Sequence, residues 1–262
     1  MNDRTDWDKR AATYDTLGWV HNPSLLDWTA EHALAAISGA VERTGLGRVM
    51  EVGCGTGALT ERIAAGGRRV LAVDVSAEML SKATARLWDH LDTVSFQPVF
   101  PGGRLPDGPF AAVVSRMVLH HAPATPAHEL GYWATLLPPG GAIVVAEGPP
   151  PSTDKMHDAN HLYRAAMALK EPGRHVFHAH EVADWLFDLG FEEVRVDERW
   201  TAGNSVRGWL TGGGIEPSRA EAIMALHREA SPAARSLYRI EETPDGDLLM
   251  KWRHCVVVGV KG

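Results

Sequence analysis

The feature that most constrains this chain is a glycine loop directly after an apolar segment. Residues 49–60 read VMEVGCGTGALT, with Gly53, Gly55 and Gly57 at alternate positions. A chain that leaves a buried strand and turns at once into a helix needs residues that tolerate unusual backbone angles, and a ligand close to the backbone needs side chains to be absent. A helix resuming at Ala58 would offer unpaired backbone N–H groups to that ligand. The segment predicts a site for an adenosine-bearing cofactor.

A second strand is expected within residues 68–76, RRVLAVDVS, and it places Asp74 at its carboxyl end. A carboxylate at this position can accept hydrogen bonds from both hydroxyls of a ribose. Gly53, Gly55 and Ala58 also fit the dinucleotide pattern G-x-G-x-x-G/A, and Asp74 lies at about the spacing expected for its acidic residue. A nicotinamide-dependent dehydrogenase is therefore an alternative interpretation.

Composition restricts the class of protein. The 262 residues are 45% hydrophobic and 23% charged, which is typical of a folded globular domain. The net charge of −7 and the absence of a basic cluster interleaved with aromatic residues argue against nucleic acid as a partner. Two cysteines give no disulfide framework, and no apolar stretch approaches the roughly 18 residues of a membrane span. We expect a cytoplasmic protein with no membrane association.

Strand and helix signals alternate along the chain, which predicts a mainly parallel sheet. Strands are expected at 49–52, 70–73, 93–97, 111–115, 142–147, 193–200 and 248–260. Helices are expected before residue 48 and at 58–65, 77–90, 127–137, 152–169 and 180–189. Ser76 is a predicted N-cap, Ser218 and Glu221 form a predicted capping box, and Ser231 before Pro232 marks another helix start. We expect one domain: 1–46 as a helical lid, 47–147 as the cofactor-binding half, and 148–177 and 201–247 as helical insertions that cap the substrate.

Four sequence blocks in a fixed order carry a family resemblance. They are the E-x-G-x-G-x-G pattern at 51–57, Asp74, FAAVVSRMVLHH at 110–121 and LLPPGGAIVVAE at 136–147. In these blocks the chain resembles class I S-adenosylmethionine-dependent methyltransferases of the small-molecule, UbiE-like type. The resemblance implies an α/β, Rossmann-like, seven-stranded, mostly parallel sheet of order 3-2-1-4-5-7-6 with the last strand antiparallel. It also implies S-adenosylmethionine as the cofactor.

The resemblance extends to cofactor-binding positions, with one departure. The expected contacts are Tyr14 from the lid, Glu51, Gly53, Cys54, Gly55, Gly57, Asp74, Val75, Met79, Phe100, Ser115 and Arg116. Family members often carry an acid after the third strand that bonds the adenine amino group, whereas residues 97–108, QPVFPGGRLPDG, contain none before Asp107. Backbone groups and apolar contact, with Phe100 as a wall, would then hold the adenine.

Candidate catalytic residues follow the fourth and fifth strands. His120 and His121 come just after the fourth strand and Glu147 ends the fifth, at the sheet edge where ligands bind in such folds. Methyl transfer needs a general base only when the acceptor must lose a proton. Either histidine is a candidate base and Glu147 a candidate for holding an acceptor hydroxyl or amine. The alternative is that these side chains cap backbone groups or pack on the cofactor.

Candidate substrate contacts lie in the lid and insertions. They are Trp19, His157, His161, Tyr163 and Trp209. The aromatic residues in these segments favour an aromatic or otherwise apolar substrate. His157 and His161 stand four residues apart on an expected helix, a spacing that can bind a metal, but we expect no metal because thirteen histidines scatter through the chain.

The sequence therefore favours a methyltransferase that modifies O, N or C of a small molecule, in secondary metabolism, as a monomer or homodimer. A second interpretation keeps the fold and cofactor without methylation, as a binding protein or a pericyclase-like enzyme. The nicotinamide dehydrogenase is the third.

Overall fold

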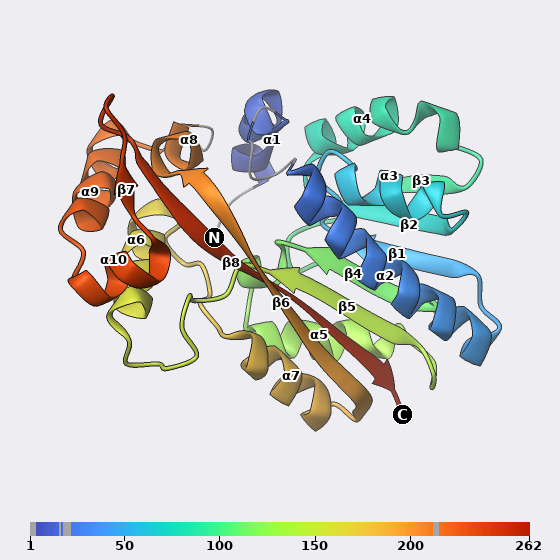
Figure 1. The fold of residues 1–262 in the computed structure, drawn as a ribbon. Coiled ribbons are helices and arrows are strands. Elements are labelled where there is room, and N and C mark those ends of the chain that lie inside the picture. The colour runs from blue at the N-terminus through green and yellow to red at the C-terminus, as the bar shows by residue number, and fades with distance from the viewer. Residues whose placement is uncertain (1–3, 16, 18–21, 212–214) are drawn as a thin grey trace.

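The computed structural model describes residues 4–15, 17, 22–211 and 215–262. Its central element is a twisted sheet (Figure 1). The strands are β1 (Arg48–Val52), β2 (Arg69–Asp74), β3 (Val94–Pro98), β4 (Ala112–Arg116), β5 (Ala142–Glu147), β6 (Phe191–Ser205), β7 (Glu241–Glu242) and β8 (Leu248–Lys261). Their order is β3-β2-β1-β4-β5-β8-β6, and β7 pairs with β8. The predicted order is confirmed, with the two-residue β7 as an additional eighth strand.

Helices cover both faces of the sheet, which explains why β1, β2, β4 and β5 are buried along nearly their whole length. The helices are α1 (Arg4–Tyr14), α2 (Pro23–Thr44), α3 (Ala58–Ala65), α4 (Ala77–Arg86), α5 (Pro126–Thr135), α6 (Asp158–Lys170), α7 (Ala179–Asp188), α8 (Val206–Thr211), α9 (Pro217–Arg228) and α10 (Pro232–Tyr238). Short 3₁₀ turns, η1 and η2, span Trp88–His90 and Leu119–His121. Successive strand residues face opposite layers: Val49 packs with α2 and α3, and Met50 packs with α5 and α7.

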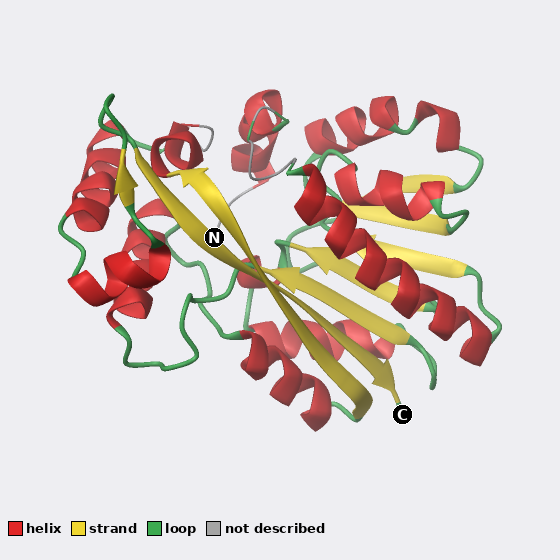
Figure 2. Cartoon of the chain, in the orientation of Figure 1, coloured by secondary structure: helices red, strands yellow, loops and turns green. Residues whose placement is uncertain are grey.

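The strands β6 and β8 form a long antiparallel hairpin that extends past the rest of the sheet (Figure 2). Its far end carries α8, α9 and α10, and α6 from the other insertion packs against them (Figure 1). A separate hydrophobic core joins these elements and includes Ala159, Leu162, Ile223, Tyr238 and Met250. We call this unit, residues 158–170 together with 206–211 and 217–250, the helical cap.

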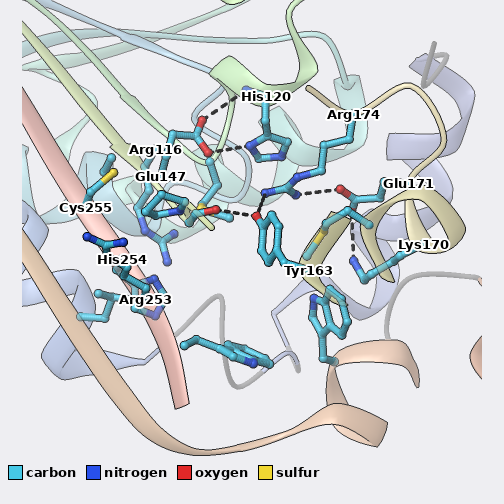
Figure 3. Close-up of a pocket in the computed structure, with 18 of the residues that line it drawn as sticks. Arg116, His120, Glu147, Tyr163, Lys170, Glu171, Arg174, Arg253, His254 and Cys255 are labelled. Atoms are coloured by element: carbon cyan, nitrogen blue, oxygen red, sulfur yellow. Dashed lines mark hydrogen bonds and ion pairs between the residues drawn. The ribbon is translucent and has the colours of Figure 1, made fainter. Parts of the chain in front are cut away.

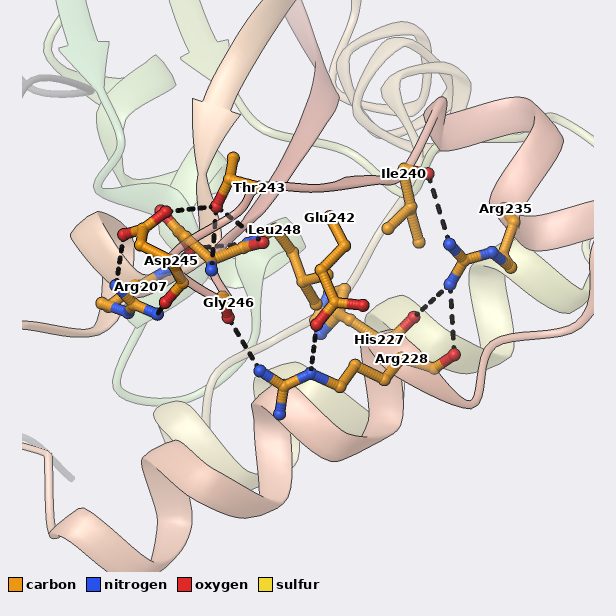
Figure 4. Close-up of polar contacts among 11 residues, drawn as sticks. Arg207, His227, Arg228, Arg235, Ile240, Glu242, Thr243, Asp245, Gly246 and Leu248 are labelled. Carbon is orange, nitrogen blue, oxygen red and sulfur yellow. Dashed lines mark hydrogen bonds and ion pairs between the residues drawn. The ribbon is translucent and has the colours of Figure 1, made fainter.

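Polar contacts fasten the turn between β7 and β8 to the helices of the cap (Figure 4). Arg207 pairs with Asp245 at 2.8 Å, and Arg228 donates to Glu242 at 3.2 Å and to the carbonyl of Gly246 at 2.7 Å. Exposed pairs of this kind each contribute little to stability, but together they fix the turn against α8 and α9. These contacts therefore hold the helices α8 and α9 in place beside the turn between β7 and β8.

Helix ends differ from expectation at several positions. The helix α6 begins at Asp158 rather than 152, because the His157 ring accepts a hydrogen bond from the Ala159 N–H at 3.1 Å and so caps it. The predicted capping box at Ser218 and Glu221 is wrong: Pro217 starts α9 one residue before Ser218. The caps at Ser76 and Ser231 are confirmed.

The helix α4 ends at Arg86, and η1 replaces the remainder of the predicted helix 77–90. Among the described helices, none combines the length and the apolar character that crossing a bilayer demands.

Candidate active site

Two adjoining cavities lie at the carboxyl ends of the parallel strands. The outer cavity, about 400 Å³, contacts the glycine loop and the ends of β1 and β2. The inner cavity, about 120 Å³, lies between the ends of β4 and β5, β8 and the helical cap. The residues that line both cavities are Trp7, Tyr14, Arg116, Met117, His121, Glu171 and Arg174. A ligand in one cavity is therefore next to a ligand in the other.

Gly53 and Gly55 bring the backbone to the outer cavity. Both have positive φ, 68° and 55°, and the Gly53 N–H donates to the Val73 carbonyl at 2.8 Å. A Cβ on Gly53 would lie 2.4 Å from Val118 Cγ2, so no other residue fits there without rearrangement. Gly57 has a different role: it does not line the cavity, and a Cβ on it would lie 2.7 Å from Leu87 Cδ1. It permits close packing of α3 on the end of α4.

Asp74 ends β2 and lines the outer cavity. Its Oδ2 accepts from the Gly55 N–H at 2.8 Å and its Oδ1 from the Ser76 N–H at 2.9 Å. Burial raises the pKa of Asp74, and these backbone donors act in the opposite direction. Each carboxylate oxygen has a second acceptor position, so the group can also accept from a ligand's hydroxyls.

Val75, Met79 and Phe100 also line the outer cavity, and the residue Phe100 is 73% exposed. Two lining residues that we did not predict are Glu129 and Trp133 of α5, and Trp133 donates to Glu129 at 3.1 Å. No motif identified them, because α5 reaches the cavity only through the packing of the sheet.

Three expected cofactor residues lie off the cavity wall. Glu51 points beneath the loop toward α3, where its Oε2 accepts from the Thr60 hydroxyl at 2.6 Å. Burial raises the pKa of Glu51 to about 7. Cys54 and Ser115 are also buried and line neither cavity. Like Gly57, these three residues therefore lie off the walls of both cavities, and their expected contact with the cofactor stays a prediction.

The helix α1 lines both cavities through Trp7 and Tyr14. Tyr14 lies over the loop, since a Cβ on Gly55 would be 3.6 Å from its ring, and burial raises the pKa of Tyr14 to about 12. Asp15 accepts from the Thr56 hydroxyl at 2.6 Å and from Arg86 at 3.2 Å. The lid is therefore bonded to the loop that it covers.

A buried histidine–glutamate pair lies at the inner cavity (Figure 3). His120 Nδ1 is 2.6 Å from Glu147 Oε2, and Glu147 Oε1 accepts from the Val118 N–H at 3.1 Å. Burial alone would raise the pKa of Glu147, but the charge and hydrogen bond of His120 outweigh it and hold the pKa below its usual value. Because Nδ1 is engaged, the other ring nitrogen of His120 is the one left for a ligand.

His121 contacts Trp7 edge-on, with ring centroids 5.1 Å apart, and lines both cavities. Burial, together with His120, lowers the pKa of His121 to about 2, so its ring is neutral near pH 7. A nitrogen of His120, a nitrogen of His121 and an oxygen of Glu171 lie within 4.8 Å of one another. Three cations contact Glu171, which disfavours a metal cation at this cluster.

The inner cavity combines aromatic walls with charged residues. Tyr163 and Trp209, two of the candidate substrate contacts, line it, and the Tyr163 hydroxyl donates to the Gly148 carbonyl at 2.6 Å. His157 and His161 do not line either cavity, because His157 caps α6 and His161 is exposed on its outer side. Trp19 lies outside the described residues. Further aromatic lining residues are Trp7, Trp28, Tyr238 and Trp252.

A basic group of residues at the inner cavity was not predicted. Lys170 and Arg174 bond Glu171 at 2.9 and 2.8 Å, and Arg10 lies 3.8 Å from it. Burial lowers the pKa of Lys170, although Glu171 opposes this effect. The run KEPGR at 170–174 was visible in the sequence, but only the fold brings it beside α1 and the end of β4.

Comparison with known proteins identifies the family. The sequence pattern of the family described as "Methyltransferase domain" matches residues 13–196, more than half of the chain. The chain belongs to the methyltransferase-domain family. The resemblance found in the sequence is thereby confirmed.

Relatives and solved structures agree with this assignment. A ubiquinone biosynthesis O-methyltransferase of Caulobacter sp. (strain K31) is 34% identical over 136 residues, 48% of this chain and 52% of that protein. One from Psychrobacter cryohalolentis is 31% identical over 151 residues, 54% of this chain and 58% of that protein. The chain thus spans little more than half the length of these two relatives. The chain shares its fold with the YcgJ protein of Bacillus subtilis, with a TM-score of 0.71, 18% identity and coverage of 88% of this chain and 98% of that one.

Proposed function

We propose that this methyltransferase-domain protein transfers the methyl group of S-adenosylmethionine to an oxygen, nitrogen or carbon of a small, aromatic or apolar molecule. The observation that supports the proposal is the shared wall: the cavity lined by Gly53, Gly55 and Asp74 adjoins a second, smaller cavity that is lined by the buried His120–Glu147 pair. The cofactor supplies an electrophilic methyl group on its sulfonium.

The outer cavity fits the cofactor on its own geometry. Asp74 keeps acceptor positions for ribose hydroxyls, and Gly53 and Gly55 let the backbone come within contact of a ligand. The aromatic lid residue Tyr14 covers this part of the loop. Glu129 supplies a carboxyl group to the same cavity, where the acid after β3 is missing and Asp107 pairs instead with the exposed Arg104.

The His120–Glu147 pair suits removal of a proton from the acceptor. Glu147 accepts from Nδ1–H and so fixes the tautomer in which Nε2 is the proton acceptor. The negative charge of Glu147 also stabilises the imidazolium that forms. A hydroxyl acceptor fits this pair best, and the Caulobacter and Psychrobacter relatives are named as O-methyltransferases.

The helical cap and the lid support a small acceptor. Trp209 of the cap lines the inner cavity together with Trp28 of α2 and Trp252 of β8, and the cavity has a volume of about 120 Å³. A small site of this kind aligns the two reactants, which is the main contribution that a protein makes to an in-line displacement.

The test uses purified protein, S-adenosylmethionine labelled in its methyl group, and separate small-molecule and protein fractions of a cell extract. We expect label in the small-molecule fraction and an equal amount of S-adenosylhomocysteine. Label only in protein would contradict a small acceptor. Product without S-adenosylhomocysteine would instead support a non-methylating use of the cofactor. Thermal stabilisation by NAD but not by S-adenosylmethionine would support a dehydrogenase.

A further inference from the structure

The described lining of the inner cavity carries an excess of positive charge. Five cationic side chains line it, against two carboxylates. The cations are Arg10, Arg116, Lys170, Arg174 and Arg253; the carboxylates are Glu147 and Glu171. Arg253 pairs with Glu198, which lies outside the lining. S-adenosylmethionine carries one further net positive charge, so the cofactor of the proposed function increases the excess.

The excess is concentrated at Glu171. Lys170 Nζ lies 2.9 Å from its Oε1 and Arg174 Nη1 lies 2.8 Å from its Oε2. Arg10 Nη1 is a third cation, 3.8 Å from Oε1. The side chains of Lys170, Arg174 and Glu171 are only 7 to 8% exposed. Three cationic side chains therefore surround one carboxylate, and a second anion beside them would be stabilised by their charge.

The guanidinium of Arg174 has unused hydrogen-bonding capacity. Its Nε is buried and has no hydrogen-bond partner among the described residues. Its Nη2 reaches the Tyr163 hydroxyl only at 3.4 Å. A buried guanidinium normally has its N–H groups satisfied, so Arg174 keeps donor capacity for an additional acceptor.

Charged and aromatic surfaces meet at Lys170. Its ammonium lies 4.8 Å from the centroid of the Trp209 ring, and Trp209 in turn contacts Trp252 edge-on at 6.0 Å. All three residues line the inner cavity, and Figure 3 shows the place of Lys170 in it. A molecule with a flat apolar body and an anionic group would occupy both surfaces at once.

We propose that the acceptor is an aromatic carboxylic acid, held through its carboxylate by Lys170, Arg174 and Arg10, with its ring among the tryptophans of the cavity. This inference rests on the proposed function and narrows its substrate class. Glu171 and His120 offer atoms within 4.8 Å of each other, so an anion bound beside Glu171 is also close to the His120–Glu147 pair.

A different anion, the carboxylate of the cofactor's own methionine, has to be separated from the acceptor's carboxylate. Arg116 and Arg174 line both cavities and do not distinguish the two anions. Lys170 and Arg10 line only the inner cavity. A variant at Lys170 therefore reports on the acceptor.

The experiment measures binding by calorimetry, with and without saturating S-adenosylhomocysteine. The probes are benzoate, phenylacetate and indole-3-acetate, each paired with its neutral carboxamide. The test variant is Lys170→Met, which removes the charge and keeps an apolar chain beside Trp209. Lys251→Met is the matched control, because the Lys251 ammonium also lies over a tryptophan, 4.7 Å from the Trp200 ring, but outside both cavities.

We expect at least one acid to bind wild-type protein about tenfold more tightly than its amide. Lys170→Met should reduce this preference to within about twofold, whereas Lys251→Met should retain it, and both should bind S-adenosylhomocysteine as wild type does.

Equal binding of every acid and its amide would overturn the proposal, as would loss of S-adenosylhomocysteine affinity in folded Lys170→Met. If Lys170→Met does not fold, Arg10→Met replaces it with the same expectations. Failure of wild-type protein to bind S-adenosylhomocysteine would count against the proposed function alone, since the acid–amide comparison is also made without it.

Discussion

His120 Nδ1 lies 2.6 Å from Glu147 Oε2, and both side chains are at most 4% exposed. Glu147 also accepts from the Val118 N–H, so its position is fixed from two sides. The pair forms because η2 turns back over the end of β5. The presence of a histidine and a glutamate in the sequence does not by itself show that the two side chains meet. This relationship turns two separate sequence candidates into one unit with a defined tautomer.

Replacing the histidine tests whether the pair takes the acceptor's proton. His120→Gln should lower kcat by roughly 10² to 10⁴ with a hydroxyl acceptor, because the proton no longer has a base, and leave S-adenosylhomocysteine affinity unchanged. His128→Gln, at an exposed position of α5, is the control. Steady-state kinetics and calorimetry measure the two effects. Unchanged kcat in His120→Gln would remove the pair from the mechanism.

The role of Asp74 is tested by the isosteric change Asp74→Asn. Loss of the charge should weaken S-adenosylhomocysteine binding by about tenfold or more, since hydrogen bonds to charged groups contribute about 1.5–3 kcal/mol. Asp107→Asn is the control, because Asp107 forms an exposed pair with Arg104 and lines neither cavity. Equal affinity of Asp74→Asn and wild type in calorimetry would show that Asp74 does not contact the ligand.

Two effects on stability require glycine at position 53, the lack of space beside Val118 and the positive φ, and they can be measured separately. Gly53→Ala should lower the free energy of unfolding by about 1–3 kcal/mol through overpacking against Val118, in addition to the cost of positive φ. Gly45→Ala isolates the second effect, since Gly45 has φ 69° and no atom near its missing Cβ. Denaturant unfolding compares the variants. If Val118→Ala does not rescue Gly53→Ala, the clash is not the cause.

Glu51 makes stability depend on pH. The pKa of Glu51 in the folded protein is about 7, above the ordinary value of 4.5. The folded state therefore binds this proton more tightly than the unfolded state does, and the resulting stability is fully present below pH 4.5 and is lost as the pH rises through 7. At pH 8 the buried charge costs up to about 3 kcal/mol. Glu51→Gln should therefore lose less stability than wild type between pH 5 and pH 8. Unfolding curves at both pH values test this, with exposed Glu42→Gln as control; an identical pH dependence of Glu51→Gln and wild type would contradict it.

The lid contacts at Asp15 should control exchange of the cofactor. Asp15→Ala removes the bonds to Thr56 and Arg86 that hold α1 on the loop, and we expect about tenfold faster dissociation of S-adenosylhomocysteine. Stopped-flow fluorescence measures the rate. Asp27→Ala, which breaks the exposed pair with Arg62, should leave it unchanged. Equal rates for Asp15→Ala and wild type would show that other contacts hold the lid.

Patterns among residues that are close in the sequence predicted much of the fold. The glycine loop, the caps at Ser76 and Ser231 and the alternation of strands and helices depend on neighbours in the chain, and the structure agrees with them. The capping box at Ser218 failed because Pro217, a residue suited to a first helical turn, moved the helix start forward. Glu51 shows a second limit: strand alternation turned its side chain toward Thr60 and away from the cavity.

The sequence by itself determined the class of protein and the cofactor loop, because backbone conformation at Gly53 and a carboxylate at the end of β2 are encoded within short segments. Only the tertiary structure decided that Glu147 meets His120, that Glu129 reaches the outer cavity, and that Lys170, Glu171 and Arg174 lie beside Arg10. These groups come from distant segments, and their charge interactions depend on the distance and burial that packing imposes, which no spacing along the chain specifies.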